Sequence, residues 1–338
     1  MRTQIVYVLV SSEKDYYLEE LWVSLFSLRQ FHPDEKVIVL VDEPTARRIR
    51  ERKQLYSLIT ELKVVDVPEE YTNKNRSREI KTSIRNIIDG DFLFIDTDTV
   101  ICGTLDEVDS LPVQNIAMVP ELHGSFKHHL TYDYVSADTK RIFGDDVSDS
   151  PYWFNSGCMF VRDNSFTRDF FRRWNENWKY SAFHKNNSTD QRALLATDKS
   201  FGYKIERLPD IYNCQMAMSI KYFYDAKIVH FWHMRKNFTP IMDFSPFMSH
   251  EIYKKLRESS AITEELSKII LNCKAAFNVD TMICGKNEIE LIFSPFHTVL
   301  WASYKKGGFA HWLLDKTIHL IQIKNNSNPI FPDAKSPQ

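Results

Sequence analysis

Glycine and proline are scarce in this sequence: 9 of the 338 residues are glycine and 13 are proline. So few of either argue against a low-complexity or disordered chain. No segment matches the Gly-x-x-x-x-Gly-Lys-Ser/Thr loop that binds phosphates in kinases and NTPases, which disfavours those classes. Residues 11–15, which follow the first apolar run, also contain no glycine. A sugar nucleotidyltransferase would be expected to carry a glycine-rich, basic loop there, so this alternative is disfavoured as well.

Long apolar runs and an excess of charge are missing too. No window approaches the roughly 18 consecutive apolar residues of a membrane span, and the first apolar run breaks at Ser11, too early for a signal peptide. The five cysteines lack metal-finger or redox spacing, which fits reduced thiols. Lys plus Arg total 43 against 45 Asp plus Glu, whereas nucleic-acid binders carry a basic excess. We therefore expect a cytoplasmic protein with no nucleic-acid partner.

Apolar runs alternate with helical patterns along the first two thirds of the chain. The expected strands are 4–10, 36–42, 62–67, 92–95, 115–119, 158–162 and 226–231, and the expected helices are 17–30, 44–60, 79–88 and 165–180. This order predicts an α/β fold with a mostly parallel sheet between helices. Residues 73–78 are a polar stretch that leads into the helix expected at 79–88, and residues 120–150 are polar and expected to be irregular. From 246 the pattern is mainly helical, so we expect a catalytic domain at 1–245 and a helical extension at 246–338.

Two aspartates follow one of the predicted strands. The run Phe92–Ile95 leads directly into Asp96, Thr97 and Asp98. If the strand continued, Asp96 and Asp98 would point the same way at its carboxyl end, which is where ligands bind in open α/β sheets. Two carboxylates there can hold Mn²⁺ or Mg²⁺. An Asp-x-Asp pattern alone is weak evidence, and Asp89-Gly90-Asp91, a second copy, is interpreted as a turn.

A histidine and a lysine near another predicted strand add to this pattern. His230 lies near the end of the strand at 226–231, where its imidazole could complete a metal site with Asp96 and Asp98. A core histidine bonded to backbone is the alternative. Lys236 follows six residues later and could place an ammonium against a leaving phosphate. A solvated surface lysine is the alternative there.

Taken in order, these segments resemble a known family. The stretch from Phe92 to Val108 is similar to the Asp-x-Asp region of GT-A-fold glycosyltransferases, especially the bacterial sugar transferases of glycosyltransferase family 8. That family follows it with an Asn-Ala/Ser-Gly segment, an Asp-Gln pair, and a closing His-x-x-Gly-x-x-Lys-Pro-Trp motif. This sequence has Asn155-Ser156-Gly157, Asp190-Gln191, and His230 six residues before Lys236. The resemblance covers residues 4 to 240. His233 and Asn237-Phe238 depart from the closing motif.

The resemblance also implies roles for particular residues. It implies metal ligation by Asp96, Asp98 and His230, and a diphosphate contact by Lys236. It places Tyr17 where it would stack on the base of the donor. It also places a basic residue near the donor, either Arg78 or Lys81, and the sequence does not choose between them. The other residues that it places around the donor are Thr97, Asn155, Ser156, Gly157 and Asp190. It places Gln191 at the reacting face of the sugar, so Asp190, Gln191 and Lys236 are the expected catalytic residues. Lys14-Asp15-Tyr16-Tyr17 departs from the family's Asp-Asn-Tyr, which bears on recognition of uridine.

The implied reaction is transfer of a hexose from a nucleotide-diphosphate sugar, UDP-glucose or UDP-galactose, to a saccharide or glycolipid, in cell-surface polysaccharide synthesis. The resemblance implies retention of configuration, and because an amide such as that of Gln191 is a poor nucleophile, we favour same-face attack. An inverting enzyme would need a carboxylate base, for which Asp133, Asp145 and Asp146 are unranked candidates. A catalytically inactive scaffold that binds sugar or a partner is the alternative from a different class.

The segment 293–324 combines aromatic residues with lysines and histidines. Such a segment can lie on an anionic membrane surface, which would suit a lipid-linked acceptor at the inner face of the membrane. Helices packed on the catalytic domain, with ordinary solvated lysines, are the favoured alternative because no sharp basic amphipathic face is evident.

Overall fold

The computed structural model describes residues 1–129, 131–216, 221–231, 244–278, 291, 294 and 308–324. The chain divides into two compact units, Met1–Met282 and Ile283–Gln338. The second contains helix α13 (Phe309–Lys324). Among the described residues, no helix combines the length and the apolar character that crossing a membrane requires.

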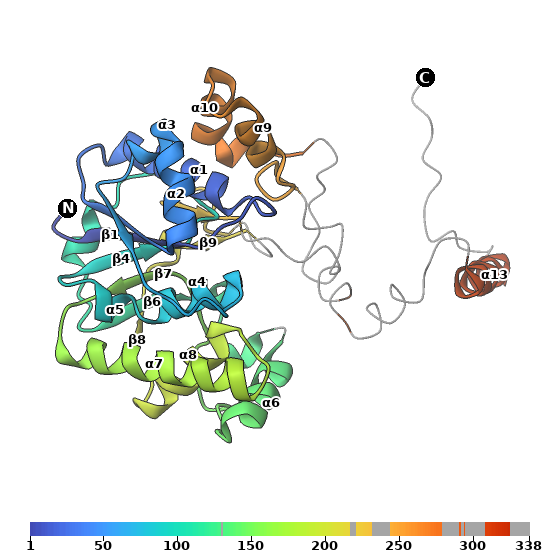
Figure 1. Ribbon diagram of the computed structural model, residues 1–338. Helices are drawn as coiled ribbons and strands as arrows, with labels where there is room; N and C mark the ends of the chain where they lie inside the picture. The colour runs from blue at the N-terminus through green and yellow to red at the C-terminus, as the bar shows by residue number, and fades with distance from the viewer. Residues whose placement is uncertain are drawn as a thin grey trace. The chain divides into compact units, whose positions relative to one another are not determined.

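A seven-stranded sheet forms the centre of the first unit, in the order β3-β2-β1-β4-β7-β6-β8 (Figure 1). Its strands are β1 (Gln4–Leu9), β2 (Val37–Val41), β3 (Glu61–Val64), β4 (Phe92–Ile95), β6 (Ile116–Pro120), β7 (Phe154–Val161) and β8 (Ile205–Arg207). Neighbouring strands pair in parallel except where β7 is involved, which runs antiparallel to both β4 and β6. The predicted α/β fold with a mostly parallel sheet is therefore confirmed.

Helices cover both faces of this sheet (Figure 1). The α-helices of the first unit are α1 (Tyr17–Phe31), α2 (Glu43–Glu51), α3 (Lys53–Tyr56), α4 (Asn73–Thr82), α5 (Ile84–Ile87), α6 (Tyr132–Phe143), α7 (Ser165–His184), α8 (Asp190–Ser200), α9 (Glu251–Ser259) and α10 (Glu264–Leu271). Side chains alternate across β1: Val6 and Val8 pack in one core cluster with Ile80 and Ile84. Tyr7 faces the other way and its hydroxyl lies 3.0 Å from that of Ser24 on α1. Continuous apolar strands thus fill two cores.

A three-stranded sheet beside the main one brings distant segments together. It has the order β5-β10-β9, with β5 (Thr99–Ile101), β9 (Cys214–Gln215) and β10 (Ile228–His230). β10 runs antiparallel to β5, and this register pairs His230 with Thr99. Short 3-10 helices complete the described unit: Asp106–Ser110, Glu121–His123, Phe126–His128, Asp210–Tyr212 and Cys273–Ala275. A histidine far along the chain is thereby placed next to the Asp-x-Asp segment.

Several local predictions were wrong. The polar residues 73–78 form the first turns of α4, because Thr72 caps that helix by accepting from the backbone N–H of Asn75. Part of the supposedly irregular 120–150 segment is helix α6, and the helix expected at 44–60 is interrupted at Arg52. The unit that carries the sheet continues to Met282 and includes α9 and α10. The division into a catalytic domain at 1–245 and a helical extension at 246–338 remains a prediction.

Candidate active site

Asp96, Thr97 and Asp98 lie in the link between β4 and β5, not on a continued strand as expected. Backbone bonds fix this link at both ends. The amide of Asp96 donates to the carbonyl of Gly157 over 2.8 Å, and the carbonyl of Asp98 accepts from the amide of Phe231 over 2.9 Å. The link between the two sheets therefore directs the Asp96 and Asp98 carboxylates toward the same point, although neither residue lies on a strand.

His230 meets these carboxylates. One ligand atom from each of Asp96, Asp98 and His230 lies within 4.8 Å of the other two. The Nε2 atom of His230 is 3.1 Å from Oδ1 of Asp98. Burial alone would lower the pKa of His230, but the charge of Asp98 raises the pKa above its ordinary value. Two carboxylates and an imidazole in this arrangement form a donor set that suits Mn²⁺.

Gly157 provides the space that His230 occupies. A Cβ atom on Gly157 would lie 2.4 Å from Cε1 of His230 and 2.7 Å from Oδ1 of Asn155. The ring therefore packs directly on the backbone of β7, and any side chain at 157 would displace it. The glycine of the Asn-Ser-Gly segment thus has a packing role beside His230.

Two basic residues of α4, Lys81 and Arg78, lie beside the site's carboxylates. The Nζ atom of Lys81 donates to both oxygens of Asp96, at 3.0 and 3.1 Å, and lies 3.8 Å from Asp190. The Nε atom of Arg78 lies 3.1 Å from Asp190. The structure thus brings both residues to the site, and each has its own carboxylate.

Asp190, the first residue of α8, is buried among these cations. Burial alone would raise its pKa, but Arg78, Lys81 and a hydrogen bond from Ser156 lower the pKa of Asp190 to about 2. The Ser156 hydroxyl donates to Oδ2 of Asp190 over 2.9 Å. Asp190 is therefore an anion at neutral pH and balances the charge of the two cations.

A buried carboxylate that the sequence analysis missed organises the Asn-Ser-Gly and Asp-Gln segments. One oxygen of Glu121, Oε2, accepts from Nδ2 of Asn155 and from Nε2 of Gln191, each over 2.8 Å. Burial raises the pKa of Glu121, and the two hydrogen bonds oppose that rise. Only its place directly after the predicted strand at 115–119 could have pointed to it, because no pattern in the sequence links it to either segment.

A cavity of about 540 Å³ opens at the carboxyl ends of β1 and β4. Its lining includes Tyr17, Arg78, Asp96, Thr97 and Asp98. Tyr17 begins α1 and is 49% exposed, so an aromatic face is available to a ligand. The position agrees with the general rule that open α/β sheets bind ligands at this edge.

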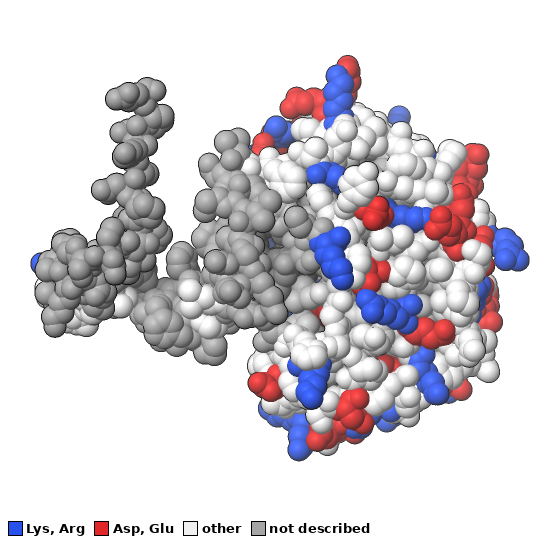
Figure 2. Space-filling model, turned by 180° about the vertical axis from the view of Figure 1, so that it is seen from behind, with Lys and Arg blue, Asp and Glu red and all other residues white. Residues whose placement is uncertain are grey.

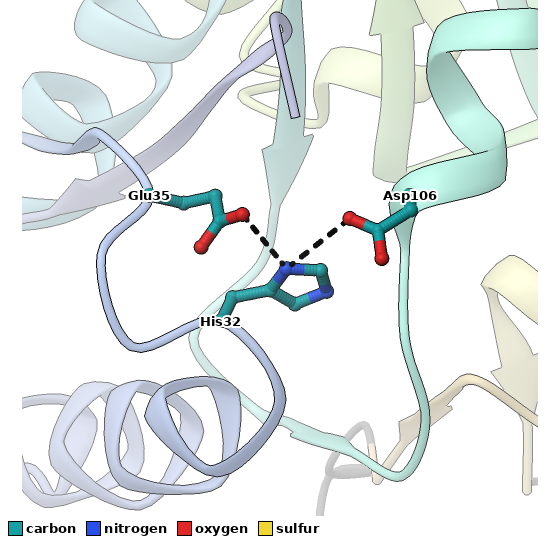
Figure 3. A group of neighbouring side chains, drawn as sticks. All are labelled: His32, Glu35 and Asp106. Carbon is teal, nitrogen blue, oxygen red and sulfur yellow. Dashed lines mark ion pairs between the residues drawn. The ribbon is translucent and has the colours of Figure 1, made fainter.

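A second cluster of metal-ligating residue types lies at the end of α1, where His32 faces Glu35 and Asp106 (Figure 3). Nδ1 of His32 is 3.5 Å from Glu35 and 3.8 Å from Asp106. Its Nε2 accepts the backbone N–H of Leu105 over 2.8 Å, so the neutral ring carries its proton on Nδ1. The atom that faces the carboxylates is therefore a hydrogen-bond donor, and this cluster is better explained as a structural tie than as a metal site.

Some expected site residues are not brought together. Lys236 lies outside the described residues. Asp133 and Asp146 are exposed, and Asp145 lines a different cavity with Arg173 and Tyr180. Asn213, a buried residue without a predicted role, contacts both Asn155 and His230. On the face that Figure 2 shows, basic and acidic side chains are interspersed, as the balanced composition predicts.

No family model and no curated protein matches the chain. Among solved structures, the chain resembles the bifunctional glycosyltransferase WbbM, with a TM-score of 0.51 and 13% identity over 79% of this chain; it spans 51% of WbbM. It also resembles an active-site variant of LgtC, with a TM-score of 0.50 and 16% identity, covering 78% of this chain and 99% of that one.

A third solved structure, galactosyltransferase LgtC in complex with donor and acceptor sugar analogues, matches with a TM-score of 0.49 and 17% identity over 79% of this chain and 99% of that one. At these identities, the likenesses at a TM-score of 0.50 and above establish the fold alone. The chain has the GT-A fold, as its sequence motifs led us to expect.

Proposed function

We propose that this protein is a metal-dependent glycosyltransferase that transfers a hexose from UDP-glucose or UDP-galactose to a saccharide or glycolipid. The observation that carries the proposal is the convergence of Asp96, Asp98 and His230 at a cavity lined by Asp96, Asp98, Tyr17 and Arg78. Their order along the chain matches the family resemblance, and the GT-A fold is shared with WbbM, a glycosyltransferase by its name.

The donor set fits Mn²⁺, and Mg²⁺ less closely. It offers two carboxylate oxygens and one imidazole nitrogen, and imidazole is a poorer ligand for Mg²⁺. When bound, the cation would neutralise charge on the diphosphate of the donor. Asp96 and Asp98 would hold it with His230.

The remaining side chains would bind and orient the donor. Tyr17 presents a half-exposed ring to the cavity for the base, and Thr97 lines the same cavity. Arg78 and Lys81 place positive charge beside it, where a departing diphosphate becomes more negative. We assign Asn155, Ser156, Gly157 and Asp190 to the sugar side, through direct contacts or through the packing of neighbours, and Lys236 to the diphosphate. These assignments follow from the resemblance.

Retention of configuration is part of the proposal. Gln191 donates its amide to Glu121, which fixes the side chain at the start of α8. An amide is a poor nucleophile, so we favour attack by the acceptor hydroxyl on the face that the diphosphate leaves. In that case Asp190 and Gln191 would orient the donor sugar and would not bond to it.

The proposal extends to the acceptor and the cellular setting. We propose synthesis of a cell-surface polysaccharide in a bacterium by a cytoplasmic enzyme, with contact of residues 293–324 to the inner membrane face as the alternative to helices packed on the catalytic domain. Phe309 and Trp312 on α13 are exposed, and Lys316 on the same helix is exposed as well. Exposed aromatic rings beside lysine suit an anionic lipid surface.

The test is hydrolysis of UDP- and GDP-sugars by the purified protein with Mn²⁺ or with EDTA. Many transferases slowly hydrolyse their donor without an acceptor, so none needs to be known. We expect Mn²⁺-dependent release of UDP from one hexose donor, and loss of that release in Asp98→Ala.

Asp106→Ala is the matched control because Asp106 belongs to the cluster around His32 and should leave hydrolysis unchanged. If no donor is hydrolysed and calorimetry detects no Mn²⁺-dependent binding of UDP-sugars, the transferase assignment fails. A scaffold without catalytic activity would then be the better description.

A further inference from the structure

Asn213 joins the metal ligands to the central sheet. It follows the 3-10 helix Asp210–Tyr212, directly before β9, and its side chain is fully buried. Its Nδ2 lies 2.9 Å from Oδ1 of Asn155, and its Oδ1 lies 2.9 Å from Nδ1 of His230. A buried amide between two polar side chains must present the correct atom to each of them.

The orientation of the Asn155 amide is fixed by two independent contacts. Its Oδ1 accepts the backbone N–H of Gly157 over 2.8 Å, and a backbone amide can only donate. Its Nδ2 donates to the carboxylate of Glu121 over 2.8 Å. Reversing the amide would place two donors together on one side, so Oδ1 of Asn155 is an acceptor.

This acceptor determines how Asn213 is oriented. Because Oδ1 of Asn155 cannot donate, Asn213 must offer its NH₂ group to it, and its own oxygen therefore faces His230. An oxygen at 2.9 Å from Nδ1 requires that Nδ1 carries a proton. The other nitrogen, Nε2, lies 3.1 Å from Asp98, so it donates to that carboxylate in the metal-free protein and offers its lone pair when a cation replaces this proton. His32 also carries its proton on Nδ1, but there Nδ1 faces the carboxylates and Nε2 accepts a backbone N–H.

We propose that Asn213 is a positioning residue for the metal centre: held by Asn155, it keeps the proton of His230 on Nδ1 and directs Nε2 at a divalent cation. The inference rests on the proposed function, because that function supplies the cation. A partner on the second ring nitrogen orients a histidine ligand and raises its affinity for metal. Asn213 thus extends the site by a residue that no sequence motif identifies.

The test compares Mn²⁺ binding by electron paramagnetic resonance in variants of the full chain. Asn213→Leu removes the acceptor and should weaken Mn²⁺ binding by about 10- to 100-fold, the range seen when such a partner is lost. Asn213→Asp keeps an oxygen toward Nδ1 but turns a second acceptor toward Oδ1 of Asn155, so it should lose less Mn²⁺ affinity than Asn213→Leu without matching the wild type. Asn177→Leu is the control: its amide bonds Thr197 on α8 and should have no effect.

A readout that needs no metal separates this inference from the proposed function. In ¹⁵N-labelled metal-free protein, His230 should show a slowly exchanging Nδ1 proton that Asn213→Leu loses while the far-ultraviolet circular dichroism stays unchanged. Three results would overturn the inference. They are wild-type Mn²⁺ affinity in a folded Asn213→Leu variant, equal losses of Mn²⁺ affinity in Asn213→Leu and Asn213→Asp, and absence of the Nδ1 proton in the wild type. If the wild type keeps the Nδ1 proton but binds no Mn²⁺, the proposed metal dependence is wrong and the ring orientation stands.

Discussion

Gly157 matters for the volume that it leaves empty. Replacing it with alanine would put a methyl group 2.4 Å from the ring of His230, a contact that requires His230 to move. We expect Gly157→Ala to weaken Mn²⁺ binding more than tenfold and to lower the free energy of unfolding by about 1–3 kcal/mol, as overpacking does. Calorimetric titration with Mn²⁺ and urea unfolding measure the two effects.

Gly103→Ala is the matched control for that substitution. The nearest side-chain atom to a Cβ at position 103 is Cγ of Lys227, at 3.7 Å, which is an ordinary contact. It should preserve both Mn²⁺ affinity and stability. Equal effects of the two substitutions would contradict the packing role that we assign to Gly157.

Asp190 provides a prediction about pH. Its pKa is about 2 in the folded protein, because Arg78 and Lys81 outweigh burial, against an ordinary aspartate value of about 3.9 in the unfolded chain. A lowered folded pKa contributes stability above the unfolded value, and that contribution is lost as the pH falls from about 4 toward 2. We expect the free energy of unfolding of the wild type to fall across this range more steeply than that of Asp190→Asn.

The same substitution has an effect at neutral pH. Asp190→Asn would leave Arg78 without its carboxylate, whereas Lys81 keeps Asp96. Breaking a buried pair costs about 3–5 kcal/mol, and the partial exposure of Arg78 places the expectation at the lower end. Urea unfolding at neutral pH measures it. Stability equal to that of the wild type would show that Asp190 does not balance these cations.

Among the secondary-structure elements, α4 decides whether the cations reach the site. Its first turns are polar, and only Ile80 and the neighbouring Ile84 supply the core contact that a periodic pattern would reveal. The capping hydroxyl of Thr72 starts the helix before that pattern begins. Arg78 and Lys81, three residues apart, then lie on the same face. Sequence periodicity could find the end of this helix but not its beginning.

Thr72→Ala tests the importance of this cap. Loss of an N-cap side chain costs about 1 kcal/mol, so we expect a drop of that size in the free energy of unfolding. Thr72→Ser, which keeps the hydroxyl, should restore most of it. Unfolding in urea distinguishes the variants, and identical stability of Ala and Ser at this position would exclude a capping role.

At the scale of the whole molecule, a role for α13 in the second compact unit can be tested separately from the site in the first. If α13 contacts a membrane, replacing the exposed Phe309 and Trp312 together with serine should lower the partition constant for anionic vesicles by about 100-fold or more, since each aromatic ring that the lipid buries contributes about 1.5–3 kcal/mol. Tyr224→Ser, which removes an aromatic that is 88% exposed in the first unit, should not. Undiminished sedimentation of the double variant would exclude membrane contact through these two residues.

The alternation of apolar runs and helical patterns was enough to predict the α/β class and most strands. Buried parallel strands are apolar on both faces, and this pattern is readable residue by residue, as in Val37–Val41. The residue types at Asp96, Asp98 and His230 were likewise sufficient to propose a metal site, because carboxylates and imidazole are typical ligands. The order of the motifs along the chain supplied the remaining evidence, through the family resemblance.

Tertiary packing determined how the site residues are brought together. That His230 reaches Asp98 follows from the pairing of β10 with β5, a contact across more than a hundred residues that no local pattern encodes. The roles of Glu121 and Asn213 depend on which buried amide faces which acceptor, and such partners exist only once the chain has folded. Local propensity and residue chemistry are properties of short segments, whereas the direction of a proton on His230 depends on four distant segments meeting in one buried network.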